Sequence, residues 1–500
     1  MLAQLPWTQP DLDYFALAPE IVLAAVICGL LLIDLFLPER SKWALSTLAG
    51  LGLLASFVPI VLLAVSDDDV RSMFGGAYVV DDFALVLKAL FVLSAYVIVL
   101  MSTNYIEEGE YYQGEYYFLL VTAVLGMVMM SSSRDLISIF VALEFLSIPG
   151  YMLAAWRKRD VKSNEAGVKY FLLGVFASAV MLYGMSLFFG VTNTTLLVGI
   201  NQSLAANENL GVLTLGIVFI IVGFAFKVSA VPFHTWAPDT YEGAPTPVAA
   251  FLSVSSKAAG FVALITLIFV GFLADSQVWE PLFWVLSALT MTVGNLIALR
   301  QRNIVRMLAY SSIAQGGFIL MPLAVVGQSA EAQRDALTAI VTYLIVYAAM
   351  NLGAFAVVIA VARKTRSGDI DSYGGLFNYA PALAVGMTIF LFSLAGIPPL
   401  GGWIAKFSVF KALLSAGGGW AVGLAVIGGV NSVIALYYYA NVARKMWMEP
   451  APDGDEGPIK VPQSLSAAMV ITALATVVIG VLPNLVLRFG GLTTLVPAGS

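Results

Sequence analysis

The stretch LTLGIVFIIVGFAFKVSAVPFHTW, residues 213–236, indicates what kind of fold this chain adopts. It is apolar for long enough to enter a bilayer, yet it contains Lys227 and is interrupted by Pro232. Residues 390–410, FLFSLAGIPPLGGWIAKFSVF, repeat the combination, with two prolines followed by Lys406. A charge at membrane depth is costly and usually marks an ion pathway. The two stretches therefore predict a membrane protein with a polar interior.

The composition supports a membrane protein. The chain has 500 residues, of which 60% are hydrophobic and 11% are charged, whereas soluble domains carry roughly 25% charged residues. The net charge is -6 and the sequence contains no basic patch, so we expect no nucleic-acid partner. One cysteine, Cys28, and one histidine, His234, exclude a disulfide framework and argue against an iron–sulfur cluster, a bis-histidine haem or a zinc site.

The hydropathy pattern predicts an all-α polytopic membrane protein with about fourteen transmembrane helices, because a spanning helix needs about 20 apolar residues. The predicted spans are 14–37, 43–65, 80–102, 116–132, 135–155, 166–190, 210–231, 246–273, 280–299, 304–326, 336–362, 382–413, 420–447 and 464–487. The N-terminus lacks the basic region of a signal peptide, so the first span is expected to be retained.

Two of the predicted spans, the seventh and the twelfth, are discontinuous because proline interrupts them. They lie five spans apart, and interruptions at corresponding positions indicate a transporter built from two repeats. The predicted repeats are spans 4–8 and 9–13, which are inverted because five is odd. The chain then divides into N-terminal helices 1–3, a first repeat, a second repeat, and a loop with helix 14. The expected boundaries are 1–115, 116–273, 280–447 and 448–500.

The basic residues of the connections predict the orientation. The connections that lead from an odd span to the next even span carry Arg40, Lys42, Arg157, Lys158, Arg159, Lys162, Arg300, Arg302, Arg306, Arg363, Lys364, Arg366, Arg444, Lys445 and Lys460. The connections that lead from an even span to the next odd span carry only Arg71, Arg134 and Arg334. By the positive-inside rule the first set faces the cytoplasm, which puts both termini outside. Two tyrosine clusters suit headgroup depth: Tyr111, Tyr112, Tyr116 and Tyr117, and Tyr437 to Tyr439.

Glu144 lies midway through the fifth span and must face the protein interior. A nearby lysine would favour its charged form, whereas burial favours the neutral form. Lys169, near the start of the sixth span, could meet Glu144 because the two spans are adjacent. The alternative is a fixed ion pair that only holds the helices together. Asp81, Asp82 and Lys88, at the start of the third span, are expected to form structural pairs.

The remaining candidates lie near the breaks. Lys227 could release and regain a proton if it is desolvated, and the alternative is that its side chain extends to the interface. His234 suits either a proton relay or a helix-capping donor. Lys257 has Ser253, Ser255 and Ser256 nearby, which can hold water or bond to the helix backbone. For Lys257 and Lys406 we favour a relay.

The chain resembles the antiporter-like membrane subunits of respiratory complex I, and most closely the subunit N branch. The resemblance covers nearly the whole chain. Its motifs are KVSAVPFHTWAPDTYEGAPTPVAAFLSVSSKAAG (227–260), QRNIVRMLAYSSIAQGG (301–317) and GIPPLGGWIAKF (396–407). In that family a glutamate lies on the fifth span, and lysines lie on the seventh, eighth and twelfth spans. The matching residues here are Glu144, Lys227, Lys257 and Lys406, in that order. Lys169 and His234 also match family positions on the central polar axis.

The resemblance implies that the chain helps to move protons across a bacterial inner membrane while other subunits pass electrons from NADH to quinone. It implies no cofactor in this chain and places NADH, FMN, Fe–S clusters and quinone in partner subunits. The implied partners are subunits M, K and J, the lateral helix of subunit L, and lipids. A proton would pass along Lys227, His234 and Lys257 to Lys406, with Glu144 controlling Lys227.

Three alternatives remain open from the sequence. The chain could belong to a multi-chain cation/proton antiporter, which has the same core. It could be a non-transporting scaffold whose polar residues hold helices together. It could also be the equivalent chain of a photosynthetic or hydrogenase-linked relative, with a different electron donor.

Overall fold

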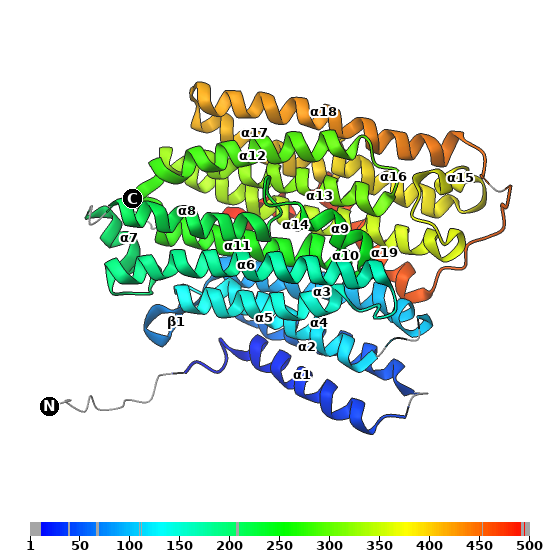
Figure 1. Ribbon diagram of the computed structural model, residues 1–500, viewed down its shortest axis with the longest axis horizontal. Coiled ribbons are helices and arrows are strands. Elements are labelled where there is room, and N and C mark those ends of the chain that lie inside the picture. Colours follow the sequence, from blue (N-terminus) through cyan, green and yellow to red (C-terminus); the bar gives the residue numbers. More distant parts are fainter. Residues whose placement is uncertain are drawn as a thin grey trace.

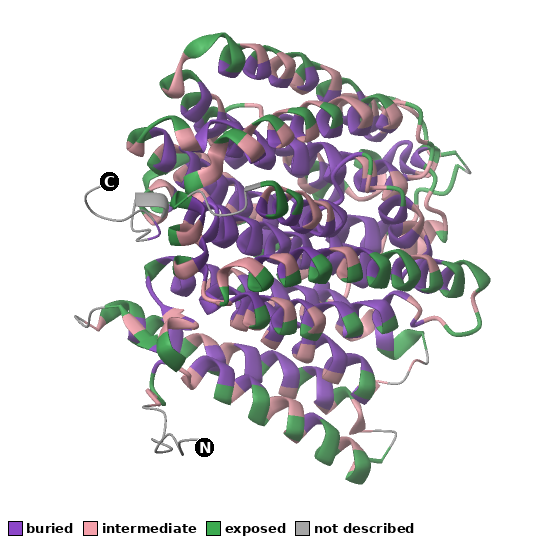
Figure 2. Cartoon of the chain, turned by 60° about the vertical axis from the view of Figure 1, so that its left-hand side comes forward, coloured by how far each residue is buried: buried purple, intermediate pink, exposed green. Residues whose placement is uncertain are grey.

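The computed structural model is a bundle of nearly parallel helices with one short hairpin (Figure 1). It describes residues 12–38, 41–66, 70–109, 111, 113–206, 210–452, 454–491 and 495. Buried residues fill the middle of the bundle, and exposed ones cover the outer helices (Figure 2). Many of the exposed side chains are large and apolar, such as Leu35 and Val433. An apolar exterior of this extent fits a lipid environment rather than water.

Within the described part of the chain, twelve helical segments are long and apolar enough to cross a membrane. Those formed by one helix are α1 (Ala18–Phe36), α2 (Trp43–Val65), α3 (Asp82–Glu108), α4 (Gln113–Ser132), α5 (Leu136–Ala154), α6 (Val161–Thr192), α14 (Ala330–Thr365), α18 (Gly418–Met448) and α19 (Gln463–Val481). The composite ones are α10 (Thr246–Phe251) with α11 (Lys257–Thr266), α12 (Ser276–Ala298) after a short turn, and α13 (Ile304–Leu320) with the turn that follows it.

The other two crossings are broken helices, as predicted. The seventh consists of α8 (Leu210–Lys227) and α9 (Trp236–Gly243), and the twelfth consists of α16 (Pro381–Ala395) and α17 (Gly401–Ala416). The prediction of fourteen spans with two discontinuous ones is thus confirmed. Several bounds differ by a turn or more: the sixth span is α6, which begins after its N-cap Asp160. Hydropathy marks the apolar part of a helix and misses its polar first turn.

The short elements between spans escaped the prediction. They are the hairpin of β1 (Arg71–Met73) and β2 (Tyr78–Val80), and the helices α7 (Leu197–Ala205), α15 (Leu376–Tyr379) and α20 (Asn484–Gly491). The all-α prediction therefore holds for every span, and the hairpin is a small exception outside them. Segments this short lack the apolar periodicity on which the prediction depends.

Two buried ion pairs join the first helices, as predicted for Asp81 and Lys88 at the start of the third span, whereas Asp82 is exposed and forms no ion pair with a described residue. Lys88 on α3 lies 2.6 Å from the carboxylate of Glu20 on α1. Asp81, the N-cap of α3, lies 2.9 Å from Arg134 at the end of α4. Each buried lysine or arginine here has a carboxylate as a fixed partner, which is the usual condition for a buried charge.

Both broken spans end their first half in the same way. In α8 the amides of Ser229 and Ala230 bond back to Phe226 O and Ala225 O, and Ser229 has a left-handed φ of 60°. In α16 the amides of Gly396 and Ile397 bond back to Ser393 O and Phe392 O, and Gly396 has a φ of 91°. This paired bonding is the Schellman ending of a helix. The last carbonyl groups of each half-helix are then free to accept other donors at membrane depth.

The two halves also share a corner. Asp135 begins α5 and Asn303 begins α13, and each side chain accepts two amides of its own first turn. The backbone of each corner forms two hydrogen bonds with the segment that follows the next long helix. In the first half, Leu136 N donates to Thr195 O and Leu197 N donates to Arg134 O. In the second half, Ile304 N donates to Gly368 O and Ile370 N donates to Arg302 O. The first corner adjoins α7 and the second precedes α15, at opposite ends of the bundle (Figure 1). Such placement is what an inverted repeat requires, and the repeat boundaries stay a prediction.

The second break depends on close packing at Gly402. A Cβ atom built there would lie 1.7 Å from Ser393 O, so Gly402→Ala must push α17 away from α16. We expect this variant to reduce the amount of folded chain recovered from membranes and to lower its thermal unfolding midpoint. Gly419→Ala on α18 is the control, because nothing lies within 4 Å of its Cβ. Equal recovery and stability of both variants would contradict this account of the break.

Candidate functional site

The first buried lysine, Lys227, is the last residue of α8 and is 5% exposed. Its Nζ donates to Ser147 Oγ on α5 at 2.9 Å and to Tyr170 OH on α6 at 3.5 Å. The negative end of the α8 dipole also favours a cation at this position. Lys227 therefore stays deep in the bundle and does not extend to the interface.

Glu144 lies one turn before Ser147 on α5 and is half-buried. Ser178 Oγ on α6 donates to its carboxylate at 2.8 Å. The carboxylate is close enough to Lys227 to interact electrostatically, but among the described residues the two do not form an ion pair within 4.0 Å. Glu144 and Lys227 are thus neighbours, and each forms its hydrogen bonds with hydroxyl groups of other side chains.

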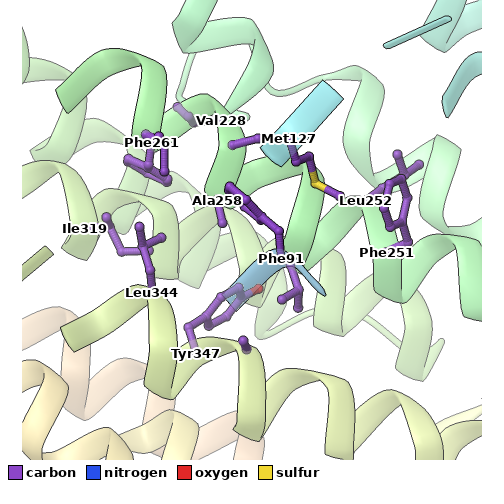
Figure 3. Close-up of a cluster of buried hydrophobic side chains, with 14 of the residues drawn as sticks. Phe91, Met127, Val228, Phe251, Leu252, Ala258, Phe261, Ile319, Leu344 and Tyr347 are labelled. Atoms are coloured by element: carbon purple, nitrogen blue, oxygen red, sulfur yellow. The ribbon is translucent and has the colours of Figure 1, made fainter. Parts of the chain in front are cut away.

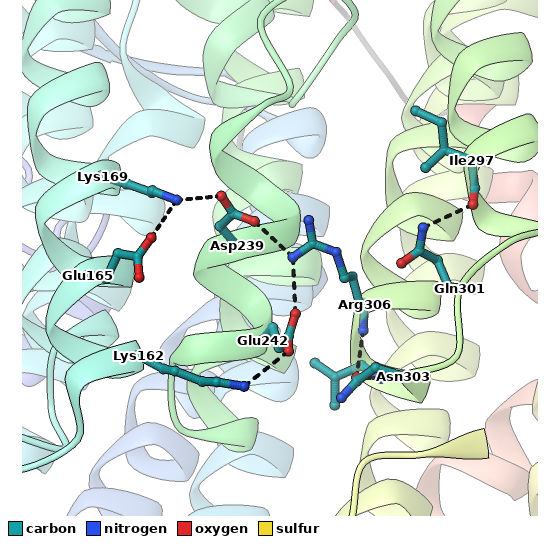
Figure 4. Close-up of polar contacts among 10 residues, drawn as sticks. Lys162, Glu165, Lys169, Asp239, Glu242, Ile297, Gln301, Asn303 and Arg306 are labelled. Atoms are coloured by element: carbon teal, nitrogen blue, oxygen red, sulfur yellow. Dashed lines mark hydrogen bonds and ion pairs between the residues drawn. The ribbon is translucent and has the colours of Figure 1, made fainter. Parts of the chain in front are cut away.

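Lys169 is not a partner of Glu144, and this prediction was wrong. Its ammonium group pairs with Glu165 and Asp239, each at 2.7 Å (Figure 4). Arg306 on α13 extends the cluster, lying 2.8 Å from Asp239 and 3.0 Å from Glu242. Lys169 points away from the fifth span because α9, the second half of the broken span, brings Asp239 to the other side of α6. The cluster joins α6, α9 and α13 and is partly exposed.

Tyr170, next to Lys169 in sequence, points the other way. Its hydroxyl group reaches Lys227, and its ring stacks on Trp236 with centroids 4.4 Å apart. The Trp236 indole N–H donates to Phe226 O, which also accepts the Ser229 amide at the end of α8. The chain between the half-helices is also fixed from the second half, because Val231 N donates to Thr290 Oγ1 on α12. These contacts hold the break in one shape.

His234 lies within the break and is half-buried. Its Nδ1 is buried and has no hydrogen-bond partner, and no described hydrogen bond joins it to Lys227 or Lys257. The structure therefore does not bring His234 into direct contact with either lysine. Among the described residues, no group of three or more His, Cys, Asp or Glu side chains could hold a metal ion.

The second buried lysine, Lys257, follows a π-helical turn at Leu252–Ser256 and is 2% exposed. Such turns occur frequently at functional sites. Its Nζ donates to Ser312 O at 2.8 Å and to Ser312 Oγ at 2.6 Å, so a residue of α13 in the second half holds it. The serines before Lys257 bind other helices: Ser253 accepts from Asn351 on α14, and Ser255 contacts Ser94 on α3.

A hydrogen-bonded chain leads from Ser311, the sequence neighbour of Ser312, to the twelfth span. Ser311, next to Ser312, lies 2.5 Å from the hydroxyl group of Tyr439 on α18. Gln315 Nε2 donates to the same hydroxyl group at 3.3 Å and to Leu394 O, a free carbonyl of α16, at 3.0 Å. Tyr343 on α14 donates to the Gln315 Oε1 atom.

The third buried lysine, Lys406 on α17, is 4% exposed. Its Nζ donates across the break to Ala395 O at 2.8 Å and lies 4.6 Å from the ring centroid of Phe318. Ala395 follows Leu394, which accepts from Gln315. The chain of polar contacts from Lys257 therefore ends one residue away from the group that binds Lys406.

Sequence reasoning missed the connecting residues Ser312, Gln315 and Tyr439. Tyr439 was placed at headgroup depth with Tyr437 and Tyr438, but only Tyr437 is exposed. Tyr116 and Tyr117 are likewise buried, and Tyr112 lies outside the described residues. Ser312 and Gln315 fall in the motif 301–317, and their polarity in an apolar span was the signal available.

Apolar side chains surround the lysines. Phe91, Phe261, Leu344 and Tyr347 belong to a buried cluster around α11 (Figure 3). Such a shell keeps water out except where polar groups admit it, and it strengthens the electrostatic interactions inside.

A cavity of about 1010 Å³ opens at the end of the bundle that carries α15. Basic side chains line it, including Arg157, Arg363 and Arg366, together with Glu108. Glu242 is also in its wall, so the cavity reaches the charged cluster that contains Arg306 and Lys169. The cavity and this cluster form a polar approach to the first break.

The amino-acid sequence matches known families of membrane proteins. Residues 133–434 match the family described as NADH:quinone oxidoreductase/Mrp antiporter, transmembrane. The NADH-quinone oxidoreductase subunit N of Trichlorobacter lovleyi is 40% identical over 475 residues, which are 94% of this chain and 95% of that protein.

Two solved structures are similar. A chain of respiratory complex I from Thermus thermophilus has a TM-score of 0.76 at 32% identity and covers 94% of this chain and 98% of its own. A chain of the Mrp complex from Dietzia sp. has a TM-score of 0.84 at 21% identity, with coverages of 96% and 97%, and shows the fold alone.

The broken spans and buried lysines define an antiporter-like polytopic membrane subunit. More particularly, the chain belongs to the NADH-quinone oxidoreductase subunit N family. It is thus a multi-span membrane protein of an oxidoreductase complex, with other subunits of that complex as its partners.

The connecting chain can be tested at Tyr439. Tyr439→Phe leaves the buried hydroxyl of Ser311 and the Gln315 amide short of a partner, so we expect a loss of about 1–3 kcal/mol in stability. Tyr437→Phe is the control two residues away, because that side chain is 68% exposed. The stability of both variants is measured as the thermal unfolding midpoint of the purified complex. An unchanged midpoint for Tyr439→Phe would mean that this hydroxyl group does not hold the chain together.

Proposed function

We propose that this chain is the proton-translocating membrane subunit of an NADH:quinone oxidoreductase, in which other subunits pass electrons from NADH to quinone. NADH, FMN, iron–sulfur clusters and quinone are bound by those partner subunits, and this chain contributes no redox centre. The main support is the kind of partner that Lys227, Lys257 and Lys406 have. Each lysine is bound by hydroxyl or carbonyl oxygen atoms. None of the three forms an ion pair with a carboxylate of a described residue.

Neutral partners suit proton transfer. A buried lysine with a fixed carboxylate, such as Lys88 with Glu20, gains stability from staying charged. Without that carboxylate, desolvation favours the neutral amine, and the side chain can release a proton and take up another. Each transfer moves one proton from an ammonium group to the next neutral acceptor, and the net charge of the axis returns to its starting value.

Proton uptake begins at the cavity beside α9. By the positive-inside rule, its basic rim faces the cytoplasm, which places both termini on the periplasmic side of a bacterial inner membrane. Glu242, Asp239 and Lys169 lead inward from the cavity, and Tyr170 lies between them and Lys227. His234, whose buried Nδ1 has no hydrogen-bond partner among the described residues, adds a titratable nitrogen at the same break.

From Lys227 the proton passes to Lys257 and then to Lys406. Tyr170 lies near both Lys227 and Ser256, the residue before Lys257. Ser311, Tyr439 and Gln315 connect Ser312 with the carbonyls beside Lys406. Lys406 is the last acceptor before release on the periplasmic side. Water molecules complete the gaps between these groups, because hydroxyl or carbonyl oxygen atoms lie at each lysine and can bind water.

Glu144 couples this axis to the rest of the complex. It lies on α5 beside an exposed apolar face that includes Val141, Phe145 and Ile148, which suits contact with another membrane subunit. A shift of that neighbour changes the separation of Glu144 and Lys227 and so the ease with which Lys227 holds its proton. The neighbours in this proposal are subunits M, K and J, the lateral helix of subunit L, and lipids, with no nucleic acid.

Lys227→Ala tests the proposal in the assembled complex. We expect the variant to assemble and to pump severalfold fewer protons in vesicles supplied with NADH and quinone, because the first acceptor is lost. Lys411→Ala is the matched control, since Lys411 is an exposed lysine of α17 that pairs with Asp335 at 3.0 Å. Proton pumping is measured with a pH-sensitive dye, and assembly by subunit content.

Unaltered pumping by fully assembled Lys227→Ala complex would overturn the role of Lys227. A scaffold role predicts in addition that Lys257 and Lys406 tolerate neutral replacement. The antiporter alternative is tested by the ion: sodium uptake by the isolated chain, driven by a pH gradient, would favour it over the proposal.

A further inference from the structure

A second large cavity lies away from the proton axis, between α2, α3, α14 and α19. Its volume is about 900 Å³, and we name it the α3 slot. It reaches along α3 from Asp82 to Val97, and this length of helix spans roughly 22 Å. That is more than half of the hydrocarbon thickness of a bilayer, which is about 30 Å.

The walls of the α3 slot are apolar. Phe57 of α2, Leu90 of α3 and Leu352 of α14 are typical of them. Its charged side chains, Asp82 and Arg488, are both exposed and lie at the end where α3 begins and α20 follows α19. An apolar cavity does not hold water, because each water molecule needs two to four polar partners. An empty cavity of this size is also unfavourable, because the lining atoms lose their contacts.

We propose that the α3 slot binds a phospholipid of the surrounding bilayer whose headgroup carries both an amine and a phosphate. The acyl chain fills the apolar walls, as lipid does at any membrane-exposed apolar surface. The phosphate pairs with Arg488 and the amine with Asp82, so the opposite charges at the mouth select a zwitterionic headgroup over an anionic one. The depth of the slot suits a chain that lies parallel to α3 and not a protein helix, which is about 10 Å wide.

Photochemical labelling tests the occupancy. Phosphatidylethanolamine with a photoactivatable acyl chain is added to vesicles that contain the whole complex, and the labelled peptides are mapped. We expect labels concentrated on α3 and α19 within the slot, and severalfold fewer in Ala89→Phe, which obstructs the slot, and in Arg488→Glu, which repels the phosphate. Phosphatidylglycerol with the same chain is expected to label the slot less.

The controls are Val426→Phe on the exposed face of α18 and Arg334→Glu, an exposed arginine at the same end of the bundle. Neither is expected to change the labelling. Labels spread evenly over the exposed helices, or unchanged in Ala89→Phe, would overturn the lipid site.

The occupancy of the slot does not depend on the proposed function. Failure of the proposed function would appear as normal pumping by Lys227→Ala and would leave the slot labelling intact.

Discussion

The structure depends on one constraint: a lysine deep in a membrane protein needs oxygen atoms to bind it, and the ends of broken helices and the hydroxyl groups of their neighbours provide them. Two Schellman endings at membrane depth release carbonyl groups, and Ala395 O of the second one binds Lys406. At the first ending, Lys227 lies at the negative end of the half-helix and is bound by the hydroxyls of α5 and α6. The breaks thus stabilise charge without a fixed carboxylate.

The same constraint explains why the two halves function as one unit. Lys257 belongs to the first half, but Ser312 of the second half provides both of its bonds. Val231 in the first break is likewise bound by Thr290 of the second half. Any movement of the halves against each other therefore changes the partners of a buried lysine. Such movement offers a physical route by which neighbouring subunits can control proton occupancy.

The sequence predicted the parts of this site that have a strong local signal. Fourteen spans, two breaks and the lysines beside them follow from hydropathy and proline alone. What it could not predict is which side chains meet across helices distant in the chain. Lys169 adjoins the fifth span in sequence, yet it pairs with Asp239 because the break turns α9 towards it. Tyr439 looked interfacial by its neighbours Tyr437 and Tyr438, but helix rotation directs it to Ser311.

The central claim is that Lys257 and Lys406 act in series on one path. The most direct test is a double-mutant comparison in the assembled complex, with proton pumping per NADH measured for Lys257→Met, Lys406→Met and both together. Steps in series predict that the double variant loses no more pumping than the more severe single variant. Losses that add, with each single variant keeping a separate share of the pumping, would contradict a single path.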